Sequence, residues 1–312
     1  MIYMKKLSVL PLFMVIVLAF VVIPAYAQPT VPAGFKATKL AEGLATTDGL
    51  KGITSALFRA GNGHFGDFLY VARSDNDKIY RVSKKGGATE FADVGDFPVG
   101  VAFGTHNGFQ GYLYVGLAYA TSNAVVRVDP SGVVSNFAAI DHIAGIAFSP
   151  DGSGYGKYLY AAQWTTGYIY RIDSAGNVYT WHTSIPGESR YIKFSHGGPF
   201  GKLLYLSETW SGKIDIVWPD ASVSTFVDTG DYEIEGLEIS PGGVWGHYLF
   251  VGVAFGADAG KILRIDPAGN VEVWADGFGA VADIHFQPGG KGGFTMYIVT
   301  GTAGEVWAIS KA

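Results

Sequence analysis

Short runs of apolar, β-branched and aromatic residues recur along the chain, separated by glycine, proline and aspartate. Such runs are typical of strands joined by turns. The clearest example predicts four strands, at Gly145–Phe148, Tyr158–Ala162, Ile169–Asp173 and Asn177–His182. The loop Ser149–Gly156, which carries a proline and three glycines, joins the first two strands. A sheet that is apolar on both faces cannot bury itself, so this pattern predicts copies of the sheet on either side.

The copies are visible as a Leu-Tyr pair that returns every 44 to 47 residues. The pair and its equivalents stand at Leu69-Tyr70, Leu113-Tyr114, Leu159-Tyr160, Leu204-Tyr205, Leu249-Phe250 and Met296-Tyr297. Six β-units with a period in the forties are typical of a β-propeller with one four-stranded blade per unit. The fold class predicted is therefore all-β, a six-bladed β-propeller.

The last unit ends near Ser310 with only three strands. The segment Phe35–Leu44 has no partner strands nearby and resembles the fourth strand at Val271–Phe278. We therefore expect the N-terminal strand to complete the sixth blade and close the ring, which removes free sheet edges. Residues 35–312 then form a single propeller, and residues 28–34 a mobile lead-in.

The first 27 residues have the features of a secretory signal peptide. Lys5 and Lys6 precede the apolar run Leu7–Ile23, and Ala25-Tyr26-Ala27 forms a cleavage signal. An uncleaved membrane anchor is the alternative, because the run is long. We expect cleavage after Ala27, a secreted or periplasmic protein, and no membrane span in the mature chain.

Composition narrows the classes of chemistry and partner. The chain contains no cysteine, which excludes disulfides, a thiolate metal site, a thiol nucleophile and a lipid-anchored cysteine. Without Lys5 and Lys6, the 22 basic residues fall to 20 against 27 acidic ones, a net charge of −7. This balance argues against nucleic acid as a partner. We expect a monomeric protein that binds a small-molecule or protein ligand.

The repeat GIAFSPDGSGYGKYLYAA resembles that of six-bladed propellers of the TolB-like group. The group includes NHL-repeat proteins, strictosidine-synthase-like proteins and the senescence-marker/gluconolactonase family. Resemblance to the last family implies a divalent metal, calcium or zinc, held at the channel by Glu, Asn and Asp side chains. The matching positions here are Lys51, Val99, Ala144, Arg190, Glu235 and Ala282. Among these Glu235 keeps a ligand type and is the candidate metal ligand.

Ionisable residues also gather at the middle of the innermost strands. The aligned positions are Leu57, Ala102, Ala147, Lys193, Glu238 and His285. Neighbouring first strands are close, so we expect Lys193 to pair with Glu238, with His285 beside them. The cluster is either an ion pair lining the channel with ordered water, or a polar well for a ligand or for proton transfer. His285 is the natural general base if there is chemistry.

Loops on one face of a propeller surround the channel mouth and usually carry its binding residues. Their polar residues are concentrated over blades four to six. The candidate ligand-binding residues are Glu188, Arg190, Lys193, Glu208, Trp210, Glu233, Glu238, Asp283 and Trp164. The tryptophans either stack on a sugar or a protein partner, or pack between blades.

The leading hypothesis is an exported module that binds a small molecule or protein at this mouth. The alternative is a metal-assisted lactonase-like hydrolase or lyase that uses Glu235 and His285. A third possibility is a surface scaffold whose channel is only filled by Lys193 and Glu238. The propeller fold hosts unrelated activities and does not decide among them.

Overall fold

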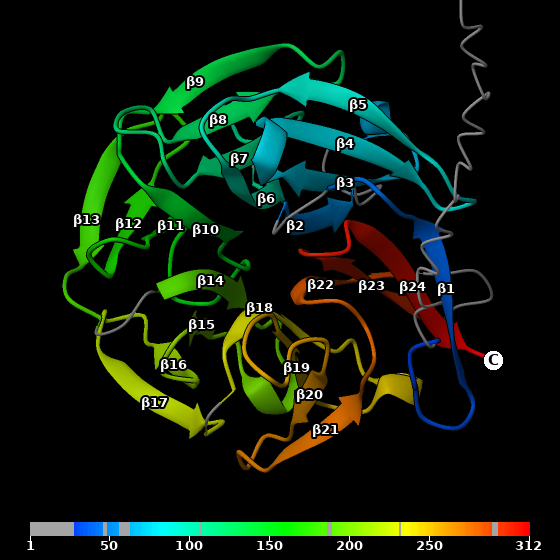
Figure 1. The fold of residues 1–312 in the computed structure, drawn as a ribbon. Coiled ribbons are helices and arrows are strands. Elements are labelled where there is room, and N and C mark those ends of the chain that lie inside the picture. Colours follow the sequence, from blue (N-terminus) through cyan, green and yellow to red (C-terminus); the bar gives the residue numbers. More distant parts are fainter. Residues whose placement is uncertain are drawn as a thin grey trace, which may run out of the picture.

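The computed structural model describes residues 28–45, 49–55, 63–106, 108–185, 189–230, 232–288 and 293–312. These residues form six four-stranded antiparallel sheets, arranged as a ring around a central channel (Figure 1). The predicted six-bladed β-propeller is therefore confirmed. The signal segment at residues 1–27 lies outside the described residues. Within the described part of the chain, no helix has the length and apolar character needed to cross a membrane.

Each blade contains one repeat, and its first strand lines the channel. Blade one contains β2 (Leu50–Ser55), β3 (Phe68–Arg73), β4 (Lys78–Ser83) and β5 (Ala88–Asp93), and blade two contains β6 (Pro98–Phe103), β7 (Leu113–Leu117), β8 (Val125–Val128) and β9 (Val134–Ala138). Blade three contains β10 (Ile143–Phe148), β11 (Leu159–Gln163), β12 (Tyr168–Ile172) and β13 (Val178–His182), and blade four contains β14 (Ser189–Phe194), β15 (Leu204–Glu208), β16 (Lys213–Val217) and β17 (Val223–Asp228). Blade five contains β18 (Ile234–Ile239), β19 (Leu249–Val253), β20 (Ile262–Ile265) and β21 (Val271–Ala275), and blade six contains β22 (Val281–Pro288), β23 (Phe294–Thr300), β24 (Glu305–Lys311) and β1 (Phe35–Ala41). Short 3-10 turns lie at η1 (Gly63–Phe65), η2 (Ser74–Asn76), η3 (Gly198–Phe200) and η4 (Gly243–Trp245).

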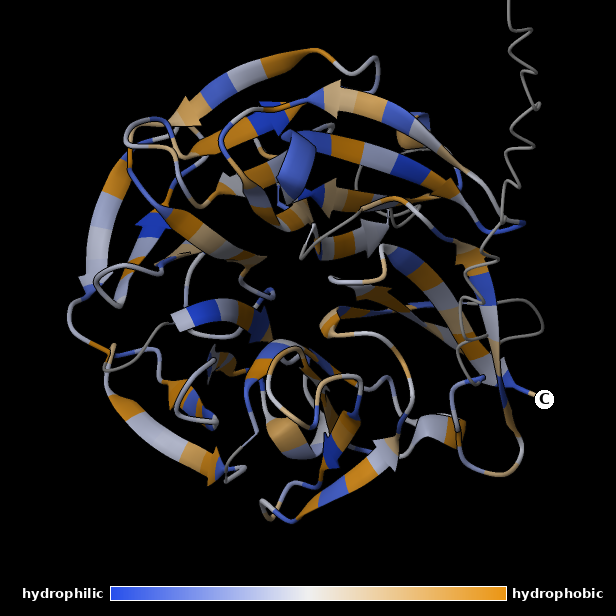
Figure 2. Ribbon diagram, viewed as in Figure 1, coloured by the Kyte–Doolittle hydropathy of each residue, from blue (hydrophilic) through white to orange (hydrophobic). Residues whose placement is uncertain are grey.

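Burial changes from the inner to the outer strands of a blade. All six residues of β10 are buried, whereas β13 contains only half-buried and exposed residues. Figure 2 shows hydrophilic and hydrophobic residues mixed along the outer strands. Inner strands are covered on both faces by neighbouring blades, so their sequences are nearly continuous apolar runs.

The repeated Leu-Tyr pair has a packing role in blades one to five. The leucine is fully buried, and the aromatic ring contacts a second ring five residues earlier, as in the edge-on pair Tyr160–Tyr155. The hydroxyl of Tyr160 donates a hydrogen bond to the carbonyl of Tyr155 at 2.7 Å, and Tyr70 and Tyr205 make the equivalent bond. In these three blades the bond fixes the loop between the first and second strands, and the ring contact accounts for the constant spacing of the aromatic residue ahead of the pair.

In four blades one position of the first strand is glycine, because the next first strand leaves no room there for a Cβ atom. A Cβ atom on Gly52 would lie 2.0 Å from the Val99 carbonyl oxygen, and one on Gly236 would lie 2.4 Å from Asp283 Cα. Blade six carries Asp283 at this position. Its carboxylate accepts hydrogen bonds from the backbone N–H of Ile53 at 3.0 Å and of Ile284 at 2.9 Å. Asp283 therefore joins the first strand of the last blade to that of blade one.

The ring closes as expected. Strand β1 pairs antiparallel with β24, from Phe35 opposite Lys311 to Ala41 opposite Val306. Phe35 also packs against the ring of Trp245, with centroids 4.8 Å apart. Within the lead-in, Thr30 exchanges two backbone hydrogen bonds with Asp276.

Candidate functional site

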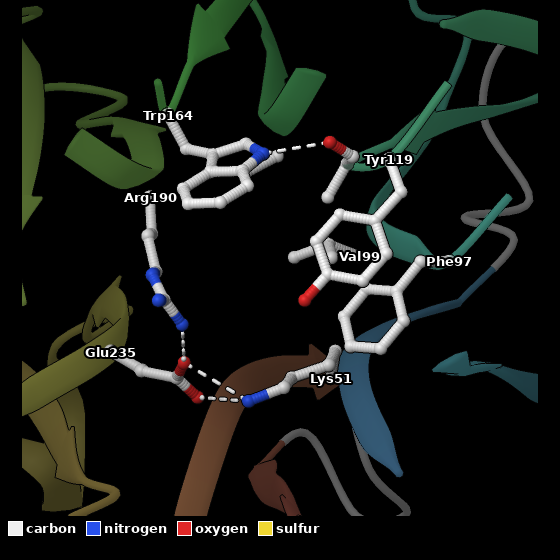
Figure 3. A pocket seen from close by; sticks show the side chains of 9 residues that line it. Lys51, Phe97, Val99, Tyr119, Trp164, Arg190 and Glu235 are labelled. Carbon is white, nitrogen blue, oxygen red and sulfur yellow. Dashed lines mark hydrogen bonds and ion pairs between the residues drawn. The ribbon is translucent and has the colours of Figure 1, made fainter. Parts of the chain in front are cut away.

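The channel mouth lies on the face that carries the loops between blades. Its cavity, of about 30 Å³, is lined by Lys51, Phe97, Val99, Ala118, Tyr119, Ala144, Trp164, Arg190 and Glu235. We call this set the mouth (Figure 3). These residues belong to blades one to five, whereas the predicted ligand-binding residues were concentrated over blades four to six.

Three charged side chains meet on one wall of the mouth (Figure 3). The Lys51 ammonium lies 3.1 and 3.2 Å from the two carboxylate oxygens of Glu235. Arg190 Nη1 donates to Glu235 Oε1 at 3.1 Å. The side chains of Lys51 and Glu235 are 2% and 1% exposed, whereas that of Arg190 is 20% exposed. Two cationic groups therefore share one carboxylate, and Arg190 is the member that solvent reaches.

Aromatic rings surround the Arg190 guanidinium. Its central carbon lies 5.4 Å from the ring centroid of Trp210, 5.7 Å from that of Trp164 and 6.0 Å from that of Phe255. Cation–π contacts of this kind favour one orientation of the side chain. Trp164 is itself fixed, because its indole N–H donates to the Ala118 carbonyl at 2.7 Å.

The other wall of the mouth is aromatic. Phe97 and Tyr119 stack with their ring centroids 4.3 Å apart, and Tyr119 is 55% exposed. Phe97 adopts φ of 62°, in the left-handed region that is costly for a bulky residue. Its backbone N–H is held by Asp77 Oδ1 at 2.9 Å. Residues kept in such conformations are concentrated at functional sites.

Tyr191 connects blade four to blade one across the ring. Its side chain is buried, and its hydroxyl donates to the Lys51 carbonyl at 2.8 Å, linking β14 to β2. Along β14, Arg190 lines the mouth while Lys193 lines a different cavity. These two cavities share no described lining residue.

The second cavity opens on the opposite face, among the loops between first and second strands. We call it the rear cavity. It has two adjoining lobes of about 310 and 560 Å³, which share His196, Glu238 and His285. The aligned residue in the middle of a first strand stands two positions after the glycine of that strand, as Glu238 does after Gly236. In blade one this residue is Thr54, two positions after Gly52, and not the predicted Leu57. Leu57 lies outside the described residues.

The predicted ion pair of the rear cavity is confirmed. Lys193 Nζ lies 3.3 Å from Glu238 Oε2, and His285 Nδ1 lies 3.7 Å from the same oxygen. His285 Nε2 lies 2.7 Å from the hydroxyl oxygen of Ser55. The ion pair is thus part of a chain of four polar groups that ends at a serine.

The charges in this chain are set by burial and by one another. Burial raises the pKa of Glu238, but Lys193 and His285 outweigh it and hold that pKa well below its usual range. Burial lowers the pKa of His285, despite the carboxylate beside it. At neutral pH the cavity therefore contains an ionised Glu238 next to a neutral imidazole.

Two predicted ligand-binding residues, Glu208 and Asp283, are buried and hydrogen-bonded within the protein. Glu208 is 4% exposed and accepts a hydrogen bond from Ser211 at 2.6 Å, and burial raises its pKa to about 7. Asp283 is 3% exposed and accepts the two backbone bonds described above; burial raises its pKa to about 6. Neither residue lines the mouth or the rear cavity as described.

The other predicted residues are divided between the two faces. Arg190, Glu235 and Trp164 line the mouth, and Trp210 lies beside Arg190. Lys193, Glu238 and His285 line the rear cavity. Glu233 precedes β18 and is half-buried. It lies near Gly256, which belongs to the loop between β19 and β20. Glu188 lies outside the described residues.

The predicted catalytic pair is therefore not brought together. Glu235 lines the mouth and His285 lines the rear cavity, and the two cavities share no described lining residue. Sequence reasoning also missed Lys51 as the partner of Glu235, Phe255 beside Arg190, and Ser55. Lys51 stood at the matching position in blade one, and a cation there was a signal that the carboxylate opposite is paired.

The residues around Glu235 do not fit the divalent metal that the resemblance implied. A hard cation needs several oxygen ligands, and Glu235 is surrounded by two cationic nitrogens instead. Among the described residues, no three His, Asp or Glu side chains are grouped as a metal site would need.

Comparison with solved structures supports the fold. Virginiamycin B lyase from Staphylococcus aureus, with quinupristin, matches at 13% sequence identity and TM-score 0.58, over 88% of this chain and 99% of that one. A putative gluconolactonase matches at 15% identity and TM-score 0.64, over 90% and 93%. An auxiliary nutrient binding protein from Bacteroides ovatus matches at 11% identity and TM-score 0.68, over 89% and 76%.

The predicted resemblance is confirmed at the level of fold. This chain is a six-bladed propeller, like these proteins. No protein-family model matches the sequence, and no curated protein is similar to it in sequence. The structural relatives include a lyase and a nutrient binding protein, so the shared fold does not decide the function.

Proposed function

We propose that the protein binds, at the mouth, a small molecule that carries a ring and an anionic group. The observation that carries this proposal is Arg190, whose partly exposed guanidinium is bordered by aromatic rings at the opening of a narrow cavity. A guanidinium presents paired donors that match a carboxylate or phosphate.

The accessible guanidinium at the mouth supports an anionic ligand. Lys51 and Arg190 share Glu235, and only Arg190 is within reach of solvent. An incoming anion would replace water at this guanidinium without separating the buried Lys51–Glu235 pair. Breaking that pair would leave an uncompensated buried charge, which costs several kcal/mol, roughly 3–5.

The small size of the mouth supports a ligand whose ring stays outside the cavity. A cavity of about 30 Å³ has room for the anionic end of a ligand and not for a ring. Trp210 and Tyr119 border the opening and are 50% and 55% exposed. Exposed aromatic faces of this kind stack on aromatic or sugar rings.

A fluorescence titration tests the proposal, because Trp164 and Trp210 both contact Arg190. The probes are phenylacetate and glucuronate, with their neutral counterparts 2-phenylethanol and glucose. We expect at least one of the two acids to bind saturably and its neutral counterpart to bind more weakly. Arg190→Gln should weaken binding of the acid by about 10-fold or more, since hydrogen bonds to charged groups contribute about 1.5–3 kcal/mol.

The matched control is Arg127→Gln. Arg127 also lies over an aromatic ring, that of Tyr112 at 4.4 Å, but belongs to the outer part of blade two. It should leave affinity for the acid unchanged. Equal affinity of wild type and Arg190→Gln, or no binding of either acid, would contradict the proposal.

We also propose that the protein is exported, on the evidence of the basic start, apolar run and Ala25-Tyr26-Ala27 at the N-terminus. Expression in a bacterial host should give a mature chain that begins at Gln28, as read by intact mass and N-terminal sequencing. Recovery of the full-length chain from the membrane fraction would instead support an uncleaved anchor.

A further inference from the structure

The rear cavity has the size of a small-molecule site and does not take part in the binding proposed at the mouth. Its lobes of about 310 and 560 Å³ fall in the range of ligand pockets. One side is apolar, formed by Val101, Phe103, Ile146, Phe148 and Phe194. The other side carries Ser55, His285, Glu238 and Lys193. An apolar pocket with a few convergent polar groups is a common form of active site.

The polar side has the order nucleophile, base, orienting acid. Ser55 Oγ lies 2.7 Å from His285 Nε2, within hydrogen-bonding distance. When Nε2 accepts the serine proton, Nδ1 carries the ring proton, and it faces Glu238 Oε2 at 3.7 Å. Serine nucleophiles are activated by a histidine that a carboxylate orients, and these contacts are often long before substrate binds.

The protonation states suit this order. Because the pKa of His285 is lowered by burial, its imidazole is neutral at pH 7 and can accept a proton. Glu238 remains ionised beside Lys193, so it can stabilise the imidazolium that forms. Burial opposes the charge of Lys193, but Glu238 and Asp283 outweigh it and raise the pKa of its ammonium group. Lys193 therefore brings a positive charge to the cavity.

We infer that the rear cavity is a metal-independent acyl-transfer site that hydrolyses carboxylic esters or lactones with an apolar acyl or alcohol group. Ser55 Oγ attacks the carbonyl carbon, its proton moves to His285 Nε2, and the carbonyl oxygen becomes an oxyanion. The ester C–O bond then breaks, and His285 returns the proton to the leaving alcohol. Water, deprotonated by His285, attacks the acyl carbon, releases the carboxylic acid and restores the serine hydroxyl.

Two further residues support these steps. Lys193, on the same wall, supplies the positive charge that opposes the oxyanion. Glu238 is a positioning residue, since it acts through His285. The apolar wall explains the preference for apolar substrates, because burying their surface there is favourable.

Covalent labelling tests the nucleophile directly. The purified protein is treated with an alkyl fluorophosphonate, with EDTA present, and the modified residue is located by peptide mass spectrometry. We expect modification at Ser55 in the wild type and none in Ser55→Ala or His285→Gln. The control Ser135→Ala changes an exposed serine on β9 and should be labelled like the wild type.

Turnover is measured with p-nitrophenyl butyrate and γ-nonalactone, also with EDTA present. Ser55→Ala removes the nucleophile and His285→Gln removes the general base, so each should lower kcat/KM by about 100-fold or more. Glu238→Gln should lower kcat and move the acid limb of the pH profile to lower pH, because the carboxylate raises the pKa of His285. A purely structural role of Glu238 would not move that limb.

The melting temperature of each variant separates loss of activity from loss of fold. Ser55→Ala removes only one hydroxyl, so a folded variant is expected. Wild-type protein that is folded but neither labelled at Ser55 nor active on either substrate would overturn the inference. Equal turnover in wild type and folded Ser55→Ala would do the same, and neither result would affect the ligand proposed at the mouth.

Discussion

A single buried carboxyl group shows how strongly surroundings decide the role of a residue. Glu208 ends β15 near the mouth, and its sequence position predicted a ligand-binding role. In the structure its side chain is buried beside Asp215, on the adjacent strand β16, and accepts a bond from Ser211. Burial, with Asp215 nearby, raises its pKa to about 7. The pair is a source of pH-dependent stability and not part of either cavity.

The sign of that dependence follows from the direction of the shift. The folded protein holds the Glu208 proton up to about pH 7, whereas the unfolded chain releases it near its ordinary value of 4.5. The free energy of unfolding should therefore fall as pH rises from about 4.5 to 7, and stay level above that range. Because glutamine cannot ionise, Glu208→Gln should lose less stability than the wild type between pH 5 and pH 8, as measured by thermal unfolding.

The control for this measurement is Glu272→Gln, which changes an exposed carboxylate paired with Arg264. Its pH dependence should match that of the wild type. Parallel curves for the wild type and Glu208→Gln would show that Glu208 is ionised in the folded state at neutral pH.

At the same scale, the sequence predicted some contacts and missed others for a physical reason. Lys193 and Glu238 occupy equivalent positions on neighbouring first strands, so the repeat alone brings them together. Lys51 reaches Glu235 from blade one to blade five, and repeat alignment does not specify a contact between blades that are not neighbours. Such a contact depends on how far each side chain extends into the channel.

At the scale of single elements, β1 is the strand that closes the ring. Six of its seven residues pair with β24, and Phe35 packs on Trp245 and Trp274 of blade five. This closure was predictable, because the last repeat lacked a strand and Phe35–Leu44 matched the missing one. The strand ends three residues earlier than that, at Ala41.

Deleting residues 35–41 should lower the melting temperature of the whole propeller. The deletion exposes the backbone groups of β24 as a free edge and uncovers the apolar residues beneath Phe35. Differential scanning calorimetry and light scattering should show earlier unfolding and more aggregation than for the full mature chain. Unchanged melting would mean that β1 is not needed to close the ring.

Strand bulges explain why the position of each residue along the channel was harder to predict than its position around the ring. The pairing of β14 with β15 shifts register between Ser189 and Tyr191, and β18 has a similar shift between Ile234 and Leu237. A bulge changes which side chain faces a given side. As a result Arg190 and Lys193 both line cavities although they are three residues apart. The sequence analysis assigned both residues to one mouth, whereas in the structure they line different cavities.

At the scale of the whole molecule, the structure divides between two cavities the residues that the sequence analysis had assigned to one site. The predicted site united residues of both faces around one mouth. The repeat period assigns each residue to a blade. Only the three-dimensional structure shows that the channel is divided into two cavities. The mouth combines an aromatic wall with a paired arginine, and the rear cavity combines an apolar wall with a serine, a histidine and a carboxylate.

The division of the channel into two cavities has a consequence for any ligand. The mouth and the rear cavity share no lining residue among those described, so a ligand bound at one end does not occupy the other. Loading at either end should therefore be non-competitive, and a saturated protein can hold two different compounds at once, one per end.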